Sequence, residues 1–211
     1  MEHKSVFHGP QMKIGSVTLP YYDKDAASER RIEISLGLDF VSRFSPDTIV
    51  EVGAVLPTHE PISHSVVDMY DVYPKSIRED AMTYDYTGKN VLSISTIEHI
   101  GRNDYAHLGD VQEISPDSAF NCLEKIVRES NKYLITFPVD WNKDLEERVK
   151  KTDYPRIIMA RDAGNNWVYR CSKDDFEFTY GKPFDYANAI CIITNIDDYL
   201  YDYDRIESIL K

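Results

Sequence analysis

Short apolar runs rich in β-branched residues recur along the chain and indicate strands. The predicted strands cover residues 48–53, 65–68, 90–95, 132–137, 154–161, 167–171 and 189–194. Between them, Ser115-Pro116-Asp117 supplies an N-cap candidate, a proline suited to the first helical position and an acid near the positive end of the helix dipole. We therefore expect a helix from there to about Ser130, and a second, charged helix over residues 142–151.

A helical pattern also precedes the first strand. Apolar residues recur every four positions from Ile32 to Phe44, and Pro46 ends the pattern. Residues 1–24 mix Gly, Pro and Lys with one short β-type run, and they predict an irregular N-terminal arm. The rest of the chain, residues 25–211, is expected to form a single domain.

The alternation of short apolar strands with helices or long connections favours an α/β fold with a mainly parallel sheet covered on both faces. In such sheets, ligands bind at the carboxyl ends of the strands, where the strand order reverses. Candidate functional residues are therefore those that directly follow Val52, Val67 and Ile94.

Composition narrows the classes of function. The 211 residues carry 24 basic and 36 acidic side chains, a net charge of −12, which disfavours a nucleic-acid partner. The longest uninterrupted apolar run, residues 189–193, is too short to span a membrane, and the first residues do not resemble a signal peptide. Three widely spaced cysteines predict reduced thiols and a cytoplasmic location.

Acidic residues stand at the ends of predicted strands. Glu51 and Gly53 end the first strand, Asp68 ends the second, and Asp80 follows 12 residues later. A carboxylate at the end of a second parallel strand can accept both ribose hydroxyls of a nucleoside, and a later acid can hold the adenine edge. Taken singly, each acid also fits a solvated turn, but the ordered set favours a nucleoside site.

Four segments carry a resemblance to a known family. They are Ser28-Glu-Arg-Arg-Ile-Glu33, Ile49-Val-Glu-Val-Gly-Ala-Val-Leu56, His64-Ser-Val-Val-Asp-Met-Tyr70 and Val91-Leu-Ser-Ile-Ser-Thr-Ile-Glu-His-Ile-Gly101. Residues 27–150 thereby resemble class I S-adenosylmethionine (SAM)-dependent methyltransferases, in particular a branch associated with polysaccharide and glycan biosynthesis. The resemblance implies a three-layer Rossmann-like methyltransferase fold, with a mostly parallel seven-stranded sheet and an antiparallel last strand.

The resemblance also implies the cofactor contacts. It puts Glu51 and Gly53 beside the methionine part of SAM, Asp68 on the ribose hydroxyls, Met69 on adenine, Asp80 and Ala81 at the adenine edge, Ser95 near the sulfonium and Arg30 at the cofactor carboxylate. The sequence departs from the family in its first loop, residues 53–64, which has one glycine and two prolines. We expect the usual first helix to be missing or reduced to a turn there.

Glu98 and His99 follow the third predicted strand and are the candidates for catalysis, with Asp104 nearby. His99 is suited to take the acceptor proton near neutral pH; the alternative is a histidine that only packs or caps the next turn. A divalent metal is not expected, although Glu98, His99 and Asp104 are conceivable ligands. His59 and His64, five residues apart, are a further pair that could bind a metal or simply pack.

Residues 101–115 are polar and flanked by glycines, and they predict either a lid with acceptor contacts at Asp104, Tyr105 and His107 or a plain surface loop. The expected function is O-methyl transfer from SAM to a hydroxyl of a sugar, a glycan or another small molecule. The alternative is a non-catalytic methyltransferase-fold module that binds SAM or a protein partner. A nicotinamide oxidoreductase is disfavoured because Gly-Ala-Val-Leu-Pro-Thr replaces the G-x-G-x-x-G motif. The sequence leaves the oligomeric state open.

Overall fold

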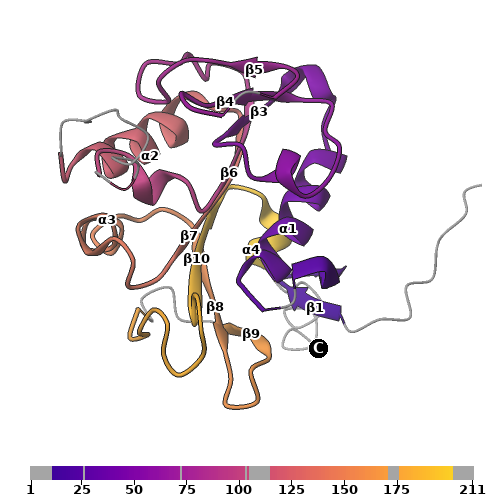
Figure 1. The fold of residues 1–211 in the computed structure, drawn as a ribbon, viewed down its shortest axis with the longest axis vertical. Coiled ribbons are helices and arrows are strands. Elements are labelled where there is room, and N and C mark those ends of the chain that lie inside the picture. The colour runs from indigo at the N-terminus through magenta and orange to yellow at the C-terminus, as the bar shows by residue number, and fades with distance from the viewer. Residues whose placement is uncertain are drawn as a thin grey trace, which may run out of the picture.

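A mixed sheet of eight strands is the centre of the computed structural model, which describes residues 11–25, 27–71, 73–102, 104, 115–170 and 176–201 (Figure 1). In spatial order the strands are β5 (Ser76–Ile77), β4 (Ser65–Val67), β3 (Ile49–Val52), β6 (Asn90–Ile94), β7 (Lys132–Pro138), β10 (Ala189–Thr194), β8 (Arg156–Arg161) and β9 (Trp167–Arg170). The strands from β5 to β7 pair in parallel, and β10 pairs antiparallel with both β7 and β8.

The predicted α/β class is confirmed, and the predicted strands are all present within one or two residues of their expected ends. The sheet differs from the expected one in two ways. It has eight strands rather than seven, because the two-residue β5 is too short to leave a pattern in the sequence. The antiparallel part also extends beyond one strand, since β9 turns back on β8 as a hairpin.

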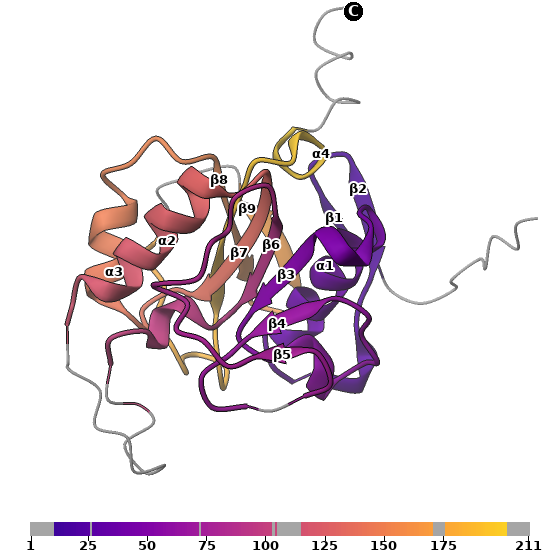
Figure 2. The same cartoon turned by 90° about the horizontal axis from the view of Figure 1, so that it is seen from above.

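Helices cover both faces of the sheet. Figure 2 shows α2 (Ser118–Glu129) and α3 (Lys143–Val149) on one face, and α1 (Arg30–Ser42) with the hairpin β1–β2 on the other. Strand β1 spans Gln11–Ile14 and β2 spans Val17–Pro20. The short helix α4 (Asp197–Leu200) lies on the face of α1. Four 3-10 turns complete the described elements: η1 (Asp23–Asp25), η2 (Pro46–Thr48), η3 (Leu56–Thr58) and η4 (Ile97–His99).

Two apolar cores lie between these layers, because successive side chains of a strand point to opposite faces. In β3, Val50 and Val52 pack into the core under α2 and α3, whereas Ile49 belongs to the core under α1. The second core also holds Ile32 and Phe40, which the helical pattern predicted to be buried.

The N-terminal segment is more ordered than the irregular arm that we expected. Met12, Ile14 and Leu19 of the β1–β2 hairpin are buried in the core under α1. Burial of these side chains makes residues 11–20 part of the domain, while residues 1–10 lie outside the described part. Among the described residues, no helix is long and apolar enough to cross a membrane.

The strand order reverses between β3 and β6. From β3 the chain moves outward to β4 and β5, and then crosses back to add β6 and β7 on the other side of β3. In open α/β sheets this reversal opens a crevice at the carboxyl ends of the central strands.

Candidate functional site

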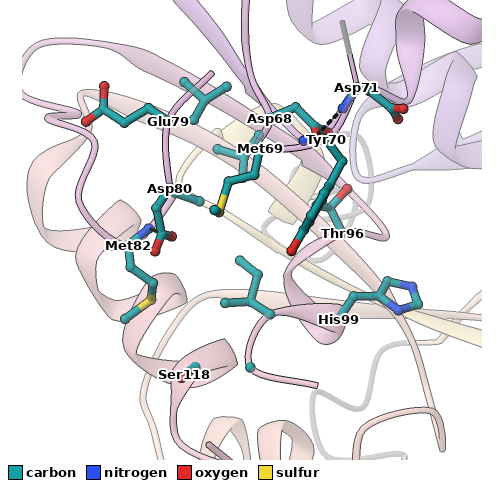
Figure 3. Close-up of a pocket in the computed structure, with 16 residues that line it drawn as sticks. Asp68, Met69, Tyr70, Asp71, Glu79, Asp80, Met82, Thr96, His99 and Ser118 are labelled. Carbon is teal, nitrogen blue, oxygen red and sulfur yellow. Dashed lines mark hydrogen bonds between the residues drawn. The ribbon is translucent and has the colours of Figure 1, made fainter. Parts of the chain in front are cut away.

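A pocket of about 360 Å³ lies at the carboxyl ends of β3, β4 and β6. Figure 3 shows its side chains converging from the loops that follow these strands, with Asp80 and Met82 at one end and His99 at the other. The lining residues are Val52, Gly53, Val67, Asp68, Met69, Tyr70, Asp71, Glu79, Asp80, Ala81, Met82, Thr96, His99, Ile100, Gly101 and Ser118. The volume falls in the range of small-molecule sites.

Gly53 brings the main chain of the first loop to the pocket wall. Its φ is +80°, and a Cβ atom added there would lie 2.2 Å from Oγ1 of Thr96. Thr96 is itself fixed, because its hydroxyl donates to the carbonyl of Ile94 at 2.9 Å. Only glycine fits this position without moving the loop after β6.

The rest of the first loop is held from inside the protein by Glu51. One oxygen of this fully buried carboxylate accepts from the N–H groups of Val55 and Leu56 at 3.0 and 2.7 Å. The other oxygen accepts from Nε2 of buried His64 at 2.9 Å. The expected reduction of the first helix is confirmed, since only the 3-10 turn η3 occurs there. Glu51 is not among the lining residues, and its predicted contact with a cofactor stays a prediction.

Asp68 ends β4 and faces the pocket. Its Oδ1 accepts from the N–H groups of Tyr70 and Asp71 at 2.8 and 2.9 Å, and its Oδ2 accepts from the N–H of Ala54 at 3.1 Å. A carboxylate has about four acceptor positions, so about one position on Oδ2 is left for a ligand hydroxyl. These bonds also fix the loops after β3 and β4 relative to each other.

Asp80 and Met82 lie at the end of the pocket away from His99 (Figure 3). Met69, Met82 and Ile100 are apolar members of the lining, and Met69 is 39% exposed. Asp80 holds this loop by accepting from the N–H of Met82 at 2.8 Å. Such a slot, with a carboxylate at its edge, suits a planar base that carries an amino group.

The pocket is strongly acidic. Four carboxylates line it, at Asp68, Asp71, Glu79 and Asp80, and no lysine or arginine is among its described lining residues. Burial and the neighbouring Asp68 charge raise the pKa of Asp71. A pocket of this charge attracts a cationic ligand and repels a phosphate-bearing one.

His99 lies at the end of η4, with carboxylates on both sides. Its Nδ1–H donates to Oδ2 of Asp104 at 2.8 Å, so in the neutral ring Nε2 carries the lone pair. Nε2 lies 3.8 Å from Oε1 of Glu98. Burial lowers the pKa of His99, although Asp104 opposes this effect, and the imidazole is therefore largely neutral at pH 7. The predicted trio of Glu98, His99 and Asp104 is thus brought together.

A buried glutamate of α1 ties this helix to the ends of two strands. Glu33 accepts from the hydroxyls of Ser95 and Thr136, both at 2.6 Å, through one oxygen, and from Arg30 at 2.5 Å through the other. Ser95 has a φ of +36°, an uncommon value for a residue with a side chain. Arg30 and Ser95 therefore lie beside the pocket and not in its lining.

The predicted site residues divide into two groups. Those that line the pocket are Gly53, Asp68, Met69, Asp80, Ala81 and His99. Those that lie outside its lining are Arg30, Glu51, Ser95, Glu98 and Asp104, the last of which lines an adjoining hollow of about 340 Å³.

The candidate metal sites gain no support. His59 and His64 have separate partners, because His59 packs edge-on against Tyr22 whereas His64 binds Glu51. No group of three or more potential ligands was found in the described part of the chain. Tyr105 and His107, the other candidate acceptor contacts, lie outside the described residues.

Sequence reasoning missed several site residues. Tyr70, Glu79 and Met82 flank predicted residues and could have been found by extending those motifs. Glu33 gave no sign of its contacts, because the hydrogen bond to Ser95 joins segments far apart in the chain. Comparisons of this chain with known protein families, with curated proteins and with solved structures found no match.

Proposed function

We propose that this protein is a SAM-dependent methyltransferase that methylates a hydroxyl group of a sugar, a glycan or another small molecule. One observation carries the proposal: a nucleoside-sized pocket at the strand-order reversal is lined by four carboxylates and by no described lysine or arginine. Nucleotide cofactors with phosphates are disfavoured there. SAM is a nucleoside without phosphate and has a positively charged sulfonium, so it matches both the shape and the charge.

The strand order supports the same proposal. The order β5-β4-β3-β6-β7 corresponds to the 3-2-1-4-5 order of doubly wound nucleotide-binding folds. With β10 antiparallel between β7 and β8, it agrees with the Rossmann-like methyltransferase fold that the sequence resemblance implies. In this arrangement Asp68 accepts from the ribose, and Met69, Asp80 and Ala81 surround the base.

In methyl transfer to a hydroxyl, the acceptor oxygen is itself the nucleophile. The protein therefore needs to supply a base that takes the hydroxyl proton. SAM, if bound, would supply an electrophilic methyl carbon to the acceptor oxygen. His99 would take the proton of the acceptor hydroxyl on Nε2. Asp104 holds the ring in the required tautomer, and the lowered pKa keeps it neutral beforehand. A divalent metal is not required by these steps.

Calorimetric titration with SAM, S-adenosylhomocysteine, ATP and NADH tests the cofactor. Micromolar binding of the first two, with no binding of the phosphate-bearing pair, is expected. The matched control is Asp153→Asn, which removes an exposed carboxylate outside the described pocket lining. Binding of ATP or NADH in preference to SAM would contradict the proposal.

A second candidate is a non-catalytic module that binds SAM or a protein partner. The observation in its favour is the first loop, where the N–H groups of Val55 and Leu56 are already bonded to Glu51. Release of S-adenosylhomocysteine in the presence of neutral hydroxyl compounds distinguishes the two. Tight SAM binding without any release supports the module.

A further inference from the structure

Two buried polar groups next to His99 have no hydrogen-bond partner among the described residues. They are both carboxylate oxygens of Glu98, which is 1% exposed, and the indole Nε1 of Trp141. Leaving such groups unpaired destabilises a fold, because each has lost its hydrogen bonds to water. Native proteins therefore keep few of them, and each one requires an explanation.

The two groups belong to one cluster. The side-chain amide of Asn142 donates to the carbonyl of Glu98 at 2.8 Å, which fixes the segment of Trp141 against η4. The rings of Trp141 and His99 meet edge to face with centroids 5.6 Å apart. Tyr180 packs on Trp141 with ring centroids 4.8 Å apart. An unpaired acceptor and an unpaired donor thus both lie beside the proposed base.

The chemistry of the pair selects one kind of ligand group. A hydroxyl both donates and accepts, so it satisfies Glu98 and Trp141 together. An ammonium only donates and would leave the indole N–H unpaired. A carboxylate or phosphate only accepts, and the charges of Glu29 and Glu33, which outnumber the one guanidinium of Arg30, also act at this position.

We infer that Glu98 and Trp141 form an acceptor subsite next to His99 that holds a second hydroxyl of an uncharged acceptor, not the hydroxyl that reacts. That the bound ligand is a methyl acceptor rests on the proposed function. Binding of a hydroxyl at this subsite can be tested without SAM. Burial raises the pKa of Glu98 well above its usual range, with Glu33 adding to the effect. This agrees with a group that accepts a neutral ligand rather than one that pairs with a cation.

The test uses the indole N–H signals in ¹⁵N-correlated NMR. The chain has two tryptophans, so Trp141→Phe assigns the Trp141 signal and leaves that of Trp167 as an internal control. The probes are benzyl alcohol, benzylamine and benzoate, which share a ring and differ in the polar group. The alcohol is expected to shift the Trp141 signal in a saturable way, with affinity at least about tenfold higher than that of the amine or the acid.

Variants then connect the signal to the two groups. Trp141→Phe keeps a ring but removes the donor, and Glu98→Leu removes the acceptor; each is expected to weaken alcohol binding about tenfold, measured by saturation-transfer NMR. Glu98→Gln, which keeps an acceptor oxygen, is expected to retain more affinity than Glu98→Leu and covers the case in which the leucine variant fails to fold. Trp167→Phe is the control and is expected to bind the alcohol as the parent does.

Three results would overturn the inference. They are no shift with any probe, which would mean that no ligand reaches the two groups; stronger binding of the amine or the acid; and unchanged alcohol binding in Trp141→Phe. Failure of the proposed function looks different. In that case the parent protein does not bind SAM by calorimetry, while the alcohol still shifts the Trp141 signal.

Discussion

Replacement of Asp68 by asparagine tests the proposed ribose contact. Three of the roughly four acceptor positions of this carboxylate are used by the N–H groups of Ala54, Tyr70 and Asp71. One position is therefore left for a ribose hydroxyl. A hydrogen bond to a charged group contributes about 1.5–3 kcal/mol, which corresponds to a loss of SAM affinity of about 10- to 150-fold.

The measurement is calorimetric titration with SAM, combined with the melting temperature of the free protein. Asparagine presents an N–H₂ group either to Ala54 or to Tyr70 and Asp71, so the melting temperature should also fall. Asp71→Asn is the matched control, because it removes the same charge from the pocket wall and should change affinity less than about threefold. If both variants lose SAM affinity equally, the loss is an effect of net charge. If Asp68→Asn keeps the affinity of the parent protein, no hydrogen bond from the ribose to Asp68 forms.

Three further predictions concern the base, the first loop and pH. His99→Ala should lower turnover about 10²- to 10⁴-fold while SAM affinity in calorimetry changes little, whereas a joint loss of affinity and stability would indicate a packing role. Gly53→Ala should destabilise the protein by about 2–5 kcal/mol in urea unfolding, from backbone strain and the clash with Thr96; an unchanged midpoint would contradict the loop geometry. Burial raises the pKa of Glu146 to about 7 from 4.5, so the folded protein keeps a proton that the unfolded chain loses, and stability falls as pH rises through this window. Glu146→Gln should therefore raise the melting temperature more at pH 8 than at pH 5, and exposed Glu147→Gln should not.

The sequence predicted the strands well because their side chains are buried on both faces. β6 and β10 consist entirely of buried residues, and β10 begins with a continuous apolar run from Ala189 to Ile193, as is typical of strands buried on both faces. β5 gave no such signal. It has two residues, and its pairing of Ser76 with Val66 depends on main-chain hydrogen bonds and not on side-chain pattern.

Site residues could be predicted from the sequence only where they come shortly after a strand of the sheet. Asp68 directly follows β4, and His99 is the last residue of η4, which follows β6; both therefore lie at the carboxyl ends of parallel strands, where the pocket opens. The partners of buried polar groups were not predictable. Nothing in the sequence indicates that Glu51 pairs with His64, or that Glu33 meets Ser95 and Thr136, because these contacts depend on how α1 and the first loop pack on the sheet.

The first loop and the charged residues of α1 both bear on how an anionic group of a ligand would be bound. In nucleotide-binding folds, free N–H groups at the start of the first helix bind the anionic part of the ligand. Here the N–H groups of Val55 and Leu56 are bonded to Glu51, so they are not available to the carboxylate of SAM. If SAM binds as proposed, its carboxylate needs another cation. Arg30, held by Glu33 at the start of α1 and close enough to Glu98 for their charges to interact, is one candidate, and it lies outside the pocket lining. Under the proposed function, the use of these two N–H groups by Glu51 would make the guanidinium of a different element more important for cofactor binding.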